Sequence, residues 1–331
     1  MPATIIDVAR DCGYSKATVS RAFASPETVS ERARERIYAS AKKLNYAPNA
    51  IARAMVRRRT ENIAFIIHEK QYPAILNPFY SPILEAVMQE GTRRGYSLFI
   101  AARQDMRLSN GDVYIKKQMD GVIFAGEADR RIIEEYRSQN IPVVLLNNHL
   151  ELEGLPCVMA DHFHGAVAAT THLYERGHRR IGLLAGRFSQ QVTDARFNGY
   201  FSVLCQYGLP LERPFVVDLD PELDEAERVM TRLLQLPDHP TAFFCTNDTI
   251  AAGAVKAALR LGLRVPEDIA VVGFDDSSLS RVVEPELTTV RIDAERMGRL
   301  AANTLFDLID GREVEELFME VPTELVVRGT T

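Results

Sequence analysis

The sequence has no long apolar run, and this absence excludes a membrane helix. Its longest apolar stretches, such as Ile63 to Ile67, fall far short of the roughly 18 residues that a transmembrane helix needs. A signal peptide is not expected either, because the charged residues Asp7 and Arg10 interrupt the N-terminal segment. We therefore expect a cytoplasmic protein.

Cysteine is also scarce. The four cysteines are far apart and include no Cys-x-x-Cys pair; they are Cys12, Cys157, Cys205 and Cys245. This usage suits a reducing compartment, where such residues are mostly small buried hydrophobes. With 331 residues, 46% hydrophobic and 25% charged, the chain has an ordinary globular composition and room for two to three domains.

The common signatures of catalysis and cofactor binding are missing as well. The sequence has no GxxxxGK[ST] loop, no GxSxG elbow, no HExxH frame, and no GxGxxG opening a helix after the first strand. Four histidines are close in sequence but do not fall on one helical face, so we expect no metal site; they are His162, His164, His172 and His178. We expect no cofactor and no enzymatic activity.

Charge is distributed unevenly along the chain. The formal net charge is -6, which read alone argues against a nucleic-acid partner. Residues 1–60, however, hold 12 basic and 5 acidic residues, a net charge of +7, and the remaining residues carry -13. A basic segment on an acidic body is typical of a nucleic-acid-binding head, although a basic surface without a partner would give the same count.

The basic segment begins with a helix-turn-helix pattern over residues 5–24. The spacing predicts a helix over 5–12 and a second over 16–23, with Gly13 supplying the positive φ of the turn between them. Ser15 is suited to cap the second helix. Small Ala9 and apolar Val19 stand where the two helices must pack together. The second helix of such a motif enters the major groove of DNA.

The exposed face of the second helix carries groups that suit DNA. Lys16 and Arg21 can read guanine edges or bind phosphates, whereas Ala17 can contact a thymine methyl group. Candidate DNA contacts also include Thr4, Ser15, Thr18 and Ser20, with Thr18 serving either a phosphate or the fold.

A third helix is predicted over 30–44, and a short segment after it has a different character. Residues 50–55 favour helix but span less than two turns, so this helix needs a partner to order it. Arginines follow at 57–59. An apolar wedge such as Met55 could enter the minor groove and kink the duplex; alternatively, Ile51 and Met55 belong to an ordinary linker.

From residue 61 onward, short apolar runs alternate with helical stretches. This alternation predicts parallel sheets with helices on both faces, and the count indicates two such sheets. The strand candidates are 62–68, 96–102, 121–126, 142–148, 157–161, 180–186, 242–247, 270–275 and 288–292. The helix candidates are 82–94, 129–139, 165–176, 196–207, 223–236, 249–261 and 294–309.

Together these motifs resemble the LacI/GalR family of transcriptional regulators over essentially the whole chain. The resemblance is carried by TIIDVARDCGYSKATVSRAF, VSERARERI and LNYAPNAIARAM, then by NPFYSPILEAV, ERGHRRIGLLAG, TNDTIAAGA, VPEDIAVVGFDD and VVRGTT. It implies an all-α helix-turn-helix head and an α/β, periplasmic-binding-protein-like body of two doubly wound parallel-sheet lobes. Two departures are methionine at the usual leucine wedge and a short connection over 103–119.

The resemblance further implies domain limits and DNA-binding residues. The head would span 1–47, a hinge helix and linker 48–60, and the effector-binding and dimerisation domain 61–331. Within that domain, lobe 1 would take about 61–160 plus 293–322, and lobe 2 about 161–292 plus 323–331. Lys16, Ala17 and Arg21 would read bases, while Tyr46, Asn49, Ala52 and Arg53 would contact the backbone or the minor groove, with Met55 as the wedge.

Ligands of parallel sheets bind beyond the carboxyl ends of the strands, and this rule gives a candidate effector site. Its candidate residues are Phe79, Tyr80, Asn147, Asp161, Gln190, Val192, Arg196, Asn247 and Asp275. The resemblance implies a sugar or sugar derivative; Arg187 and Arg196 would favour a sugar acid. A purine is disfavoured, because Pro221 stands where the purine repressor has its second stacking aromatic.

The sequence therefore predicts a dimeric, sequence-specific regulator, most simply a repressor, whose affinity for a palindromic operator responds to a small molecule. The alternative is a sugar-binding protein or an enzyme with an incidental basic N-terminal arm.

Overall fold

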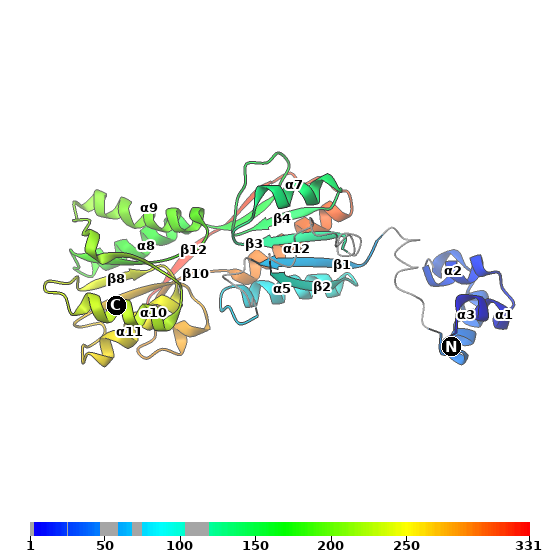
Figure 1. Cartoon of the computed structure of the whole chain (residues 1–331), viewed down its shortest axis with the longest axis horizontal. Coiled ribbons are helices and arrows are strands. Elements are labelled where there is room, and N and C mark those ends of the chain that lie inside the picture. Colours follow the sequence, from blue (N-terminus) through cyan, green and yellow to red (C-terminus); the bar gives the residue numbers. More distant parts are fainter. Residues whose placement is uncertain (1–2, 25, 47–58, 68–74, 103–118) are drawn as a thin grey trace. The chain divides into compact units, whose positions relative to one another are not determined.

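The computed structural model describes residues 3–24, 26–46, 59–67, 75–102 and 119–331. Contacts divide the chain into two units, an N-terminal head and a body, with the first boundary after Asn62 (Figure 1). Among these described residues, no helix is both long and apolar enough to cross a membrane.

The head is a three-helix unit, as predicted. Its helices are α1 (Ile5–Cys12), α2 (Lys16–Ala24) and α3 (Glu31–Lys43). Gly13 ends α1 in the left-handed conformation, with a φ of 75°. Two side chains from each of these short helices enter a shared core, which contains Val8, Cys12, Val19, Ala22, Ile37 and Ala41.

Polar contacts fix the angles between the three helices. The Tyr38 hydroxyl of α3 donates to the Ala22 carbonyl oxygen at the end of α2, at 2.9 Å. The Asp11 carboxylate of α1 accepts bonds from Ser40 and Lys43 of α3, both at 2.7 Å. These bonds place α1 and α2 against α3 and leave one face of α2 uncovered.

The first sheet of the body forms lobe 1. Its strands are β1 (Asn62–Ile67), β2 (Ser97–Ala102), β3 (Gly121–Ala125), β4 (Val143–Leu146), β5 (Cys157–Ala160) and β11 (Phe318–Val321), in the order β11-β5-β4-β3-β1-β2. Strands β1, β3, β4, β5 and β11 are parallel. Helices α5 (Tyr80–Arg93) and α12 (Ala294–Ile309) cover one face, and α7 (Arg130–Ser138) packs on the other.

The second sheet forms lobe 2. Its strands are β6 (Ile181–Gly186), β7 (Val216–Leu219), β8 (Ala242–Cys245), β9 (Ala270–Asp275), β10 (Thr288–Ile292) and β12 (Thr323–Val326), in the order β12-β10-β9-β8-β6-β7. Helices α8 (His162–Glu175) and α9 (Gln190–Tyr207) cover one face, and α10 (Leu223–Leu234) and α11 (Asp248–Arg260) the other.

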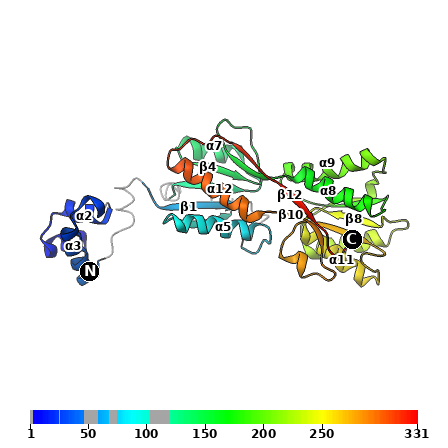
Figure 2. The ribbon, with the colours of Figure 1, turned by 180° about the vertical axis from the view of Figure 1, so that it is seen from behind.

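In the described part of the chain, three connections pass between the lobes. They follow β5, β10 and β11, so that α8, α12 and β12 each belong to the opposite lobe from the strand before them (Figure 2). The carboxyl ends of the parallel strands of both lobes therefore face the same gap, which is where the strand-end rule places a ligand.

The predicted fold class is confirmed, but the strand pattern needs three additions and one correction. The short strands β7, β11 and β12 were not predicted, because each is half-exposed or alternates instead of forming a buried apolar run. Strand β12 pairs antiparallel with β10, so the sheet of lobe 2 is mixed and not wholly parallel. Helix α9 also begins at Gln190, six residues before the predicted start.

Three helix pairs meet at a glycine. A methyl group on Gly253 of α11 would come 2.5 Å from the Leu223 carbonyl oxygen of α10, and one on Gly298 of α12 would come 2.5 Å from the Ile83 carbonyl oxygen of α5. Gly199 of α9 meets the Phe163 carbonyl oxygen of α8 in the same way. Each pair is thus packed backbone against backbone, closer than any side chain allows.

We expect Gly253→Ala to lower the free energy of unfolding by about 1–3 kcal/mol, because the new methyl group overpacks the contact with α10. Gly91→Ala on α5 is the matched control, since its methyl group would lie an ordinary 3.6 Å from the Tyr96 carbonyl oxygen. The control should be neutral or stabilising by up to about 1 kcal/mol. Denaturant unfolding of the two variants measures both; equal effects would contradict the close approach.

Candidate functional sites

The uncovered face of α2 presents the side chains predicted to read DNA. Ser15, Lys16, Ala17 and Arg21 are exposed, whereas Val19 and Ala22 on the opposite face are fully buried. The core therefore holds the helix rigidly by one side and leaves two cations and a small apolar surface on the other. This arrangement is the one that a helix entering the major groove requires.

The other predicted DNA contacts take different positions. The Ser15 hydroxyl caps α2 by accepting from the Thr18 backbone N–H at 3.1 Å, and the two hydroxyls are 2.8 Å apart. Exposed Thr4 caps α1, where its hydroxyl donates to Asp7 at 2.7 Å and lowers the pKa of that carboxyl. Ser20 and Tyr46 are half-buried. The predicted hinge contacts Asn49, Ala52, Arg53 and Met55 lie outside the described residues.

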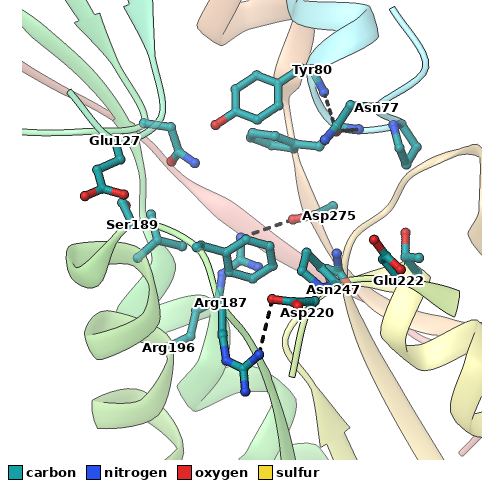
Figure 3. A pocket seen from close by; sticks show the side chains of 17 residues that line it. Asn77, Tyr80, Glu127, Arg187, Ser189, Arg196, Asp220, Glu222, Asn247 and Asp275 are labelled. Carbon is teal, nitrogen blue, oxygen red and sulfur yellow. Dashed lines mark hydrogen bonds and ion pairs between the residues drawn. The ribbon is translucent and has the colours of Figure 1, made fainter. Parts of the chain in front are cut away.

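A cleft with a volume of about 490 Å³ lies between the two lobes of the body (Figure 3). Its size is that of a small-molecule site. Seven predicted effector residues line it: Phe79, Tyr80, Asn147, Val192, Arg196, Asn247 and Asp275. The remaining lining residues are Asn77, Pro78, Glu127, Arg187, Phe188, Ser189, Asp220, Pro221, Glu222 and Thr249.

Asp161 and Gln190, also predicted for this site, do not line the cleft. Asp161 caps α8, where its carboxylate accepts from the His164 backbone N–H at 3.0 Å and contacts the His164 ring. The Gln190 side-chain amide donates to Asp194 at 2.7 Å, one turn further along α9. Both side chains are thus bonded to groups of the helix that they begin.

Arg196 is the central polar group at the base of the cleft. Its side chain is 3% exposed, and its guanidinium donates to the Thr246 carbonyl oxygen, to Asp275 at 3.1 Å, and to the His162 ring. The guanidinium also lies over the Phe274 ring, 3.9 Å from its centroid. A buried cation is tolerable only when donors and charge are satisfied in this way.

Asp275 is held in a conformation that few non-glycine residues adopt. Its φ is 109° at the last residue of strand β9. The neighbouring Asp276 also has a positive φ and turns the other way, where it accepts from Arg328 at 2.6 Å and Arg291 at 2.7 Å. Two adjacent carboxylates thus serve different cation partners, and the strained backbone between them fits a functional site.

Burial raises the pKa of two neighbouring carboxyl groups, Asp275 in the cleft lining and Asp248 behind it. The pKa of Asp275 is raised to about 6 by desolvation, against the opposing effect of Arg196. Desolvation and the nearby Asp275 charge raise the pKa of Asp248 to about 7. Asp248 sits behind the cleft, where it accepts from Thr289 at 2.5 Å and from the Ser277 backbone N–H at 2.6 Å.

The charge of the lining is acidic. Four carboxylates face two guanidinium groups, and each guanidinium has a carboxylate partner: Arg196 pairs with Asp275, and Arg187 with Asp220 at 3.3 Å. Asn247 uses its amide oxygen to cap α11 at the Ile250 backbone N–H, so its amide nitrogen is what it offers a ligand. The cleft therefore presents many acceptors and several donors but no unpaired cation among its described lining residues.

Most of the lining residues that the sequence did not reveal follow a strand. Glu127 comes after β3, Phe188 and Ser189 after β6, and Asp220 and Glu222 after β7. The rule that ligands bind beyond strand ends would identify these five residues if every strand were known. Asp220 and Glu222 were missed because β7 was not predicted.

The four neighbouring histidines have separate environments. His162 is buried between Asn147 and Arg196, and His164 contacts Asp161. His172 bonds the Thr331 hydroxyl and His178 the Thr241 hydroxyl, both at 2.8 Å.

A helix-turn-helix head with an exposed basic recognition face, together with a two-lobed body, defines a DNA-binding transcriptional regulator. Residues 4–49 match the model of bacterial regulatory proteins of the lacI family, and residues 170–331 match a periplasmic binding protein-like domain. The chain belongs to the lacI family of bacterial regulatory proteins.

Relatives align over nearly the whole chain. The transcriptional repressor CytR of Escherichia coli (strain K12) is 34% identical and covers 99% of this chain and 96% of its own length. The repressor PurR of Actinobacillus pleuropneumoniae serotype 3 (strain JL03) is 33% identical and covers 98% of this chain and 97% of its own length. A structure of the Lac repressor bound to ONPG has a TM-score of 0.85 and 27% sequence identity, and it covers 100% of this chain and 100% of its own length. A complex of the transcriptional regulator CelR with cellobiose has a TM-score of 0.75 and 30% sequence identity, and it covers 99% of this chain and 100% of its own length.

We expect Arg196→Met to lower the free energy of unfolding by about 3–5 kcal/mol, because it leaves Asp275 buried without its cation. Arg187→Ala removes the half-exposed pair with Asp220 and is the matched control, with an expected loss below about 1 kcal/mol. Denaturant unfolding at several pH values compares the two.

The pH dependence has a definite sign. Without Arg196 the pKa of Asp275 rises further above its unfolded value, so the stranded carboxyl takes up a proton as the pH falls. The loss caused by Arg196→Met should therefore be smaller at pH 5 than at pH 8. A loss independent of pH, or one no larger than in the control, would contradict a buried ion pair at the base of the cleft.

Proposed function

We propose that this regulator binds a palindromic operator as a dimer and represses transcription, and that an uncharged polyhydroxylated effector in the cleft controls its affinity for DNA. The carrying observation is the recognition face of α2, where exposed Lys16 and Arg21 stand on a helix whose opposite face is buried. No enzymatic activity is part of the proposal, and the place of action is the cytoplasm.

Base reading is assigned to α2. Arg21 and Lys16 supply the guanine-reading or phosphate-binding cations, and Ala17 an apolar contact. Thr4, Ser15, Thr18, Ser20 and Tyr46 are proposed to contact the DNA backbone. Asn49, Ala52 and Arg53 are assigned to the hinge over 48–60, with Met55 as a wedge in the minor groove.

Dimerisation is assigned to lobe 1. Strand β2 is at the edge of its sheet and exposes Phe99 by 50% and Ile100 by 41%; Met88 of the neighbouring α5 is 50% exposed. Among the described residues, large apolar side chains exposed at the edge of a sheet favour a protein partner. A second copy of the chain is the partner we propose, because a two-fold dimer matches a palindrome of two half-sites.

The charge of the cleft supports a neutral effector over the sugar acid that the two arginines suggested. Both guanidinium groups have carboxylate partners, and Glu127 and Glu222 add further negative charge. An anionic ligand would be repelled, whereas sugar hydroxyls can donate to carboxylates and accept from amides. Phe79 and Phe188 provide apolar faces, although Arg196 lies over the Phe188 ring.

Coupling between effector and operator follows the two-state logic of linked sites. The effector contacts both lobes, so it binds one lobe arrangement more tightly than the other and shifts the population of the DNA-binding form. The size of the shift equals this difference in affinity.

For the DNA site, we expect the full chain to select a palindrome from a random duplex library. Arg21→Ala should then weaken binding to that palindrome by about 1–3 kcal/mol while hardly changing binding to random DNA, because it removes a base contact. Arg10→Ala, an exposed cation on α1, is the matched control and should affect both duplexes alike. Fluorescence anisotropy over a salt series measures the affinities.

Further outcomes of the same assay test the rest of the DNA model. A single half-site should bind far more weakly than the palindrome, as a dimer requires. Met55→Gly should weaken binding to the palindrome much more than to random DNA; equal losses would refute the wedge. A fragment of residues 61–331 should not bind the palindrome. If this fragment bound DNA as tightly as the full chain does, the regulator model would be wrong.

For the effector, we expect calorimetry of the full chain to find a neutral sugar that binds more tightly than its corresponding sugar acid. Asp220→Asn and Glu222→Gln together should narrow this preference, because they remove negative charge from the cleft while keeping its shape. Purine bases are included in the series. Tighter binding of a sugar acid or of a purine would overturn the proposed effector class.

A further inference from the structure

One segment of lobe 1, residues 147–149, is fastened to lobe 2 at two points. At the base, the Asn147 side-chain oxygen lies 2.7 Å from Nε2 of His162. At the rim, the Gln191 side chain bonds both backbone groups of His149: it accepts from the N–H at 2.8 Å and donates to the carbonyl oxygen at 2.5 Å. Asn147 follows β4 of lobe 1, whereas His162 begins α8 and Gln191 is the second residue of α9, both in lobe 2.

The protonation of His162 follows from its partners. Arg196 can only donate, and it approaches Nδ1 of His162 through Nε at 3.3 Å and Nη2 at 3.2 Å. Nδ1 must therefore be bare, and the proton of the neutral ring lies on Nε2, where it is donated to the Asn147 oxygen. The two contacts independently require the same tautomer, and an imidazolium would set an N–H against the guanidinium.

The surroundings of His162 favour this neutral form. The ring is 2% exposed, and burial together with the Arg196 charge holds its pKa well below the usual range. The other charged groups nearby face Arg196: Asp275 bonds the guanidinium and Asp248 stands behind it. The Phe274 ring of β9 packs 6.1 Å away. The bridge from Asn147 through His162 to Arg196 thus joins two cleft-lining side chains of opposite lobes through one neutral ring.

We infer that His162 and Gln191 are positioning residues that lock residues 147–149 of lobe 1 to lobe 2 and so hold the two walls of the effector cleft in register. This inference rests on the proposed function only in naming the cleft as the effector site. Neither residue lines the cavity itself. Separation of the lobes breaks the bonds to Asn147 and His149 but leaves the bond between His162 and Arg196 intact, because both belong to lobe 2.

Two amide substitutions of His162 separate its roles. In His162→Gln the amide nitrogen replaces Nε2 and keeps the bond to Asn147. In His162→Asn the amide oxygen replaces Nδ1 and keeps the bond to Arg196, but the shorter side chain no longer reaches Asn147. Gln191→Ala removes the rim contact at an exposed position, so it tests the lock without disturbing the buried core.

Lobe separation is measured by electron–electron double resonance in the full chain without ligand. Spin labels are placed on exposed positions of the two lobes, Arg131→Cys on α7 and Asn198→Cys on α9, with exposed Cys205 replaced by serine. Labelled chain is diluted into unlabelled chain so that only distances within one chain are seen. His162→Gln should keep the parent distribution, whereas His162→Asn and Gln191→Ala should shift it to longer distances.

Several results would overturn the inference. One is an unchanged distribution in both His162→Asn and Gln191→Ala; another is an equal shift in His162→Gln and His162→Asn, which a purely structural role would produce. The tautomer is tested by nitrogen NMR of the full chain labelled with ¹⁵N-histidine, where His162 should keep one bare and one protonated nitrogen from pH 7.5 to 5.5. A charged ring, or a proton on Nδ1, contradicts the bridge.

These measurements need no effector, so they test the lock between the lobes independently of the proposed function. If calorimetry finds no neutral sugar while the distance shifts and the tautomer hold, the effector class is wrong and the lock remains. If sugars bind but the distances do not respond, the lock is wrong and the effector proposal remains.

Discussion

The body depends on one buried guanidinium. Arg196 keeps its charge, so its polar neighbours must together neutralise that charge and accept its N–H groups. Asp275 supplies the charge, Thr246 a carbonyl oxygen and His162 a bare ring nitrogen. These partners come from three elements of lobe 2, and His162 extends the network to Asn147 in lobe 1. The base of the cleft is therefore built around the needs of a single cation before any ligand is present.

The head follows a simpler constraint. Its small core buries one face of each short helix, and capping bonds take up the backbone groups at the ends of α1 and α2. This core holds α2 in a fixed orientation, which matters for function because a helix that reads base edges must keep its side chains in register with the groove. In both units, a few buried contacts set the orientation of side chains that stay available to a partner.

The sequence predicted the fold closely where a pattern has one physical meaning. Gly13 between two amphipathic segments predicted the turn, and buried apolar runs predicted strands such as β9 and β10 with their observed limits. It failed at β7, whose half-exposed residues resemble a loop, and the cleft residues Asp220 and Glu222 were missed with it. Asp161 and Gln190 were predicted as strand-end residues facing a ligand, but they stand at the starts of helices α8 and α9, which begin earlier than predicted, and their side chains bond within those helices. The pairing of Arg187 with Asp220 and of Arg196 with Asp275 was equally hidden, and it changes the inferred charge of the ligand.

The glycine contacts at Gly199, Gly253 and Gly298 have a mechanical consequence. At each of these glycines the backbones of two helices are in direct contact. We therefore expect the helix pairs α8–α9, α10–α11 and α5–α12 not to slide past each other, so that each lobe moves as a rigid body. Among the described residues, the segments that can bend between the lobes are then the short connections after β5, β10 and β11. We therefore expect any rotation of one lobe against the other to be taken up by these connections and not by deformation within a lobe.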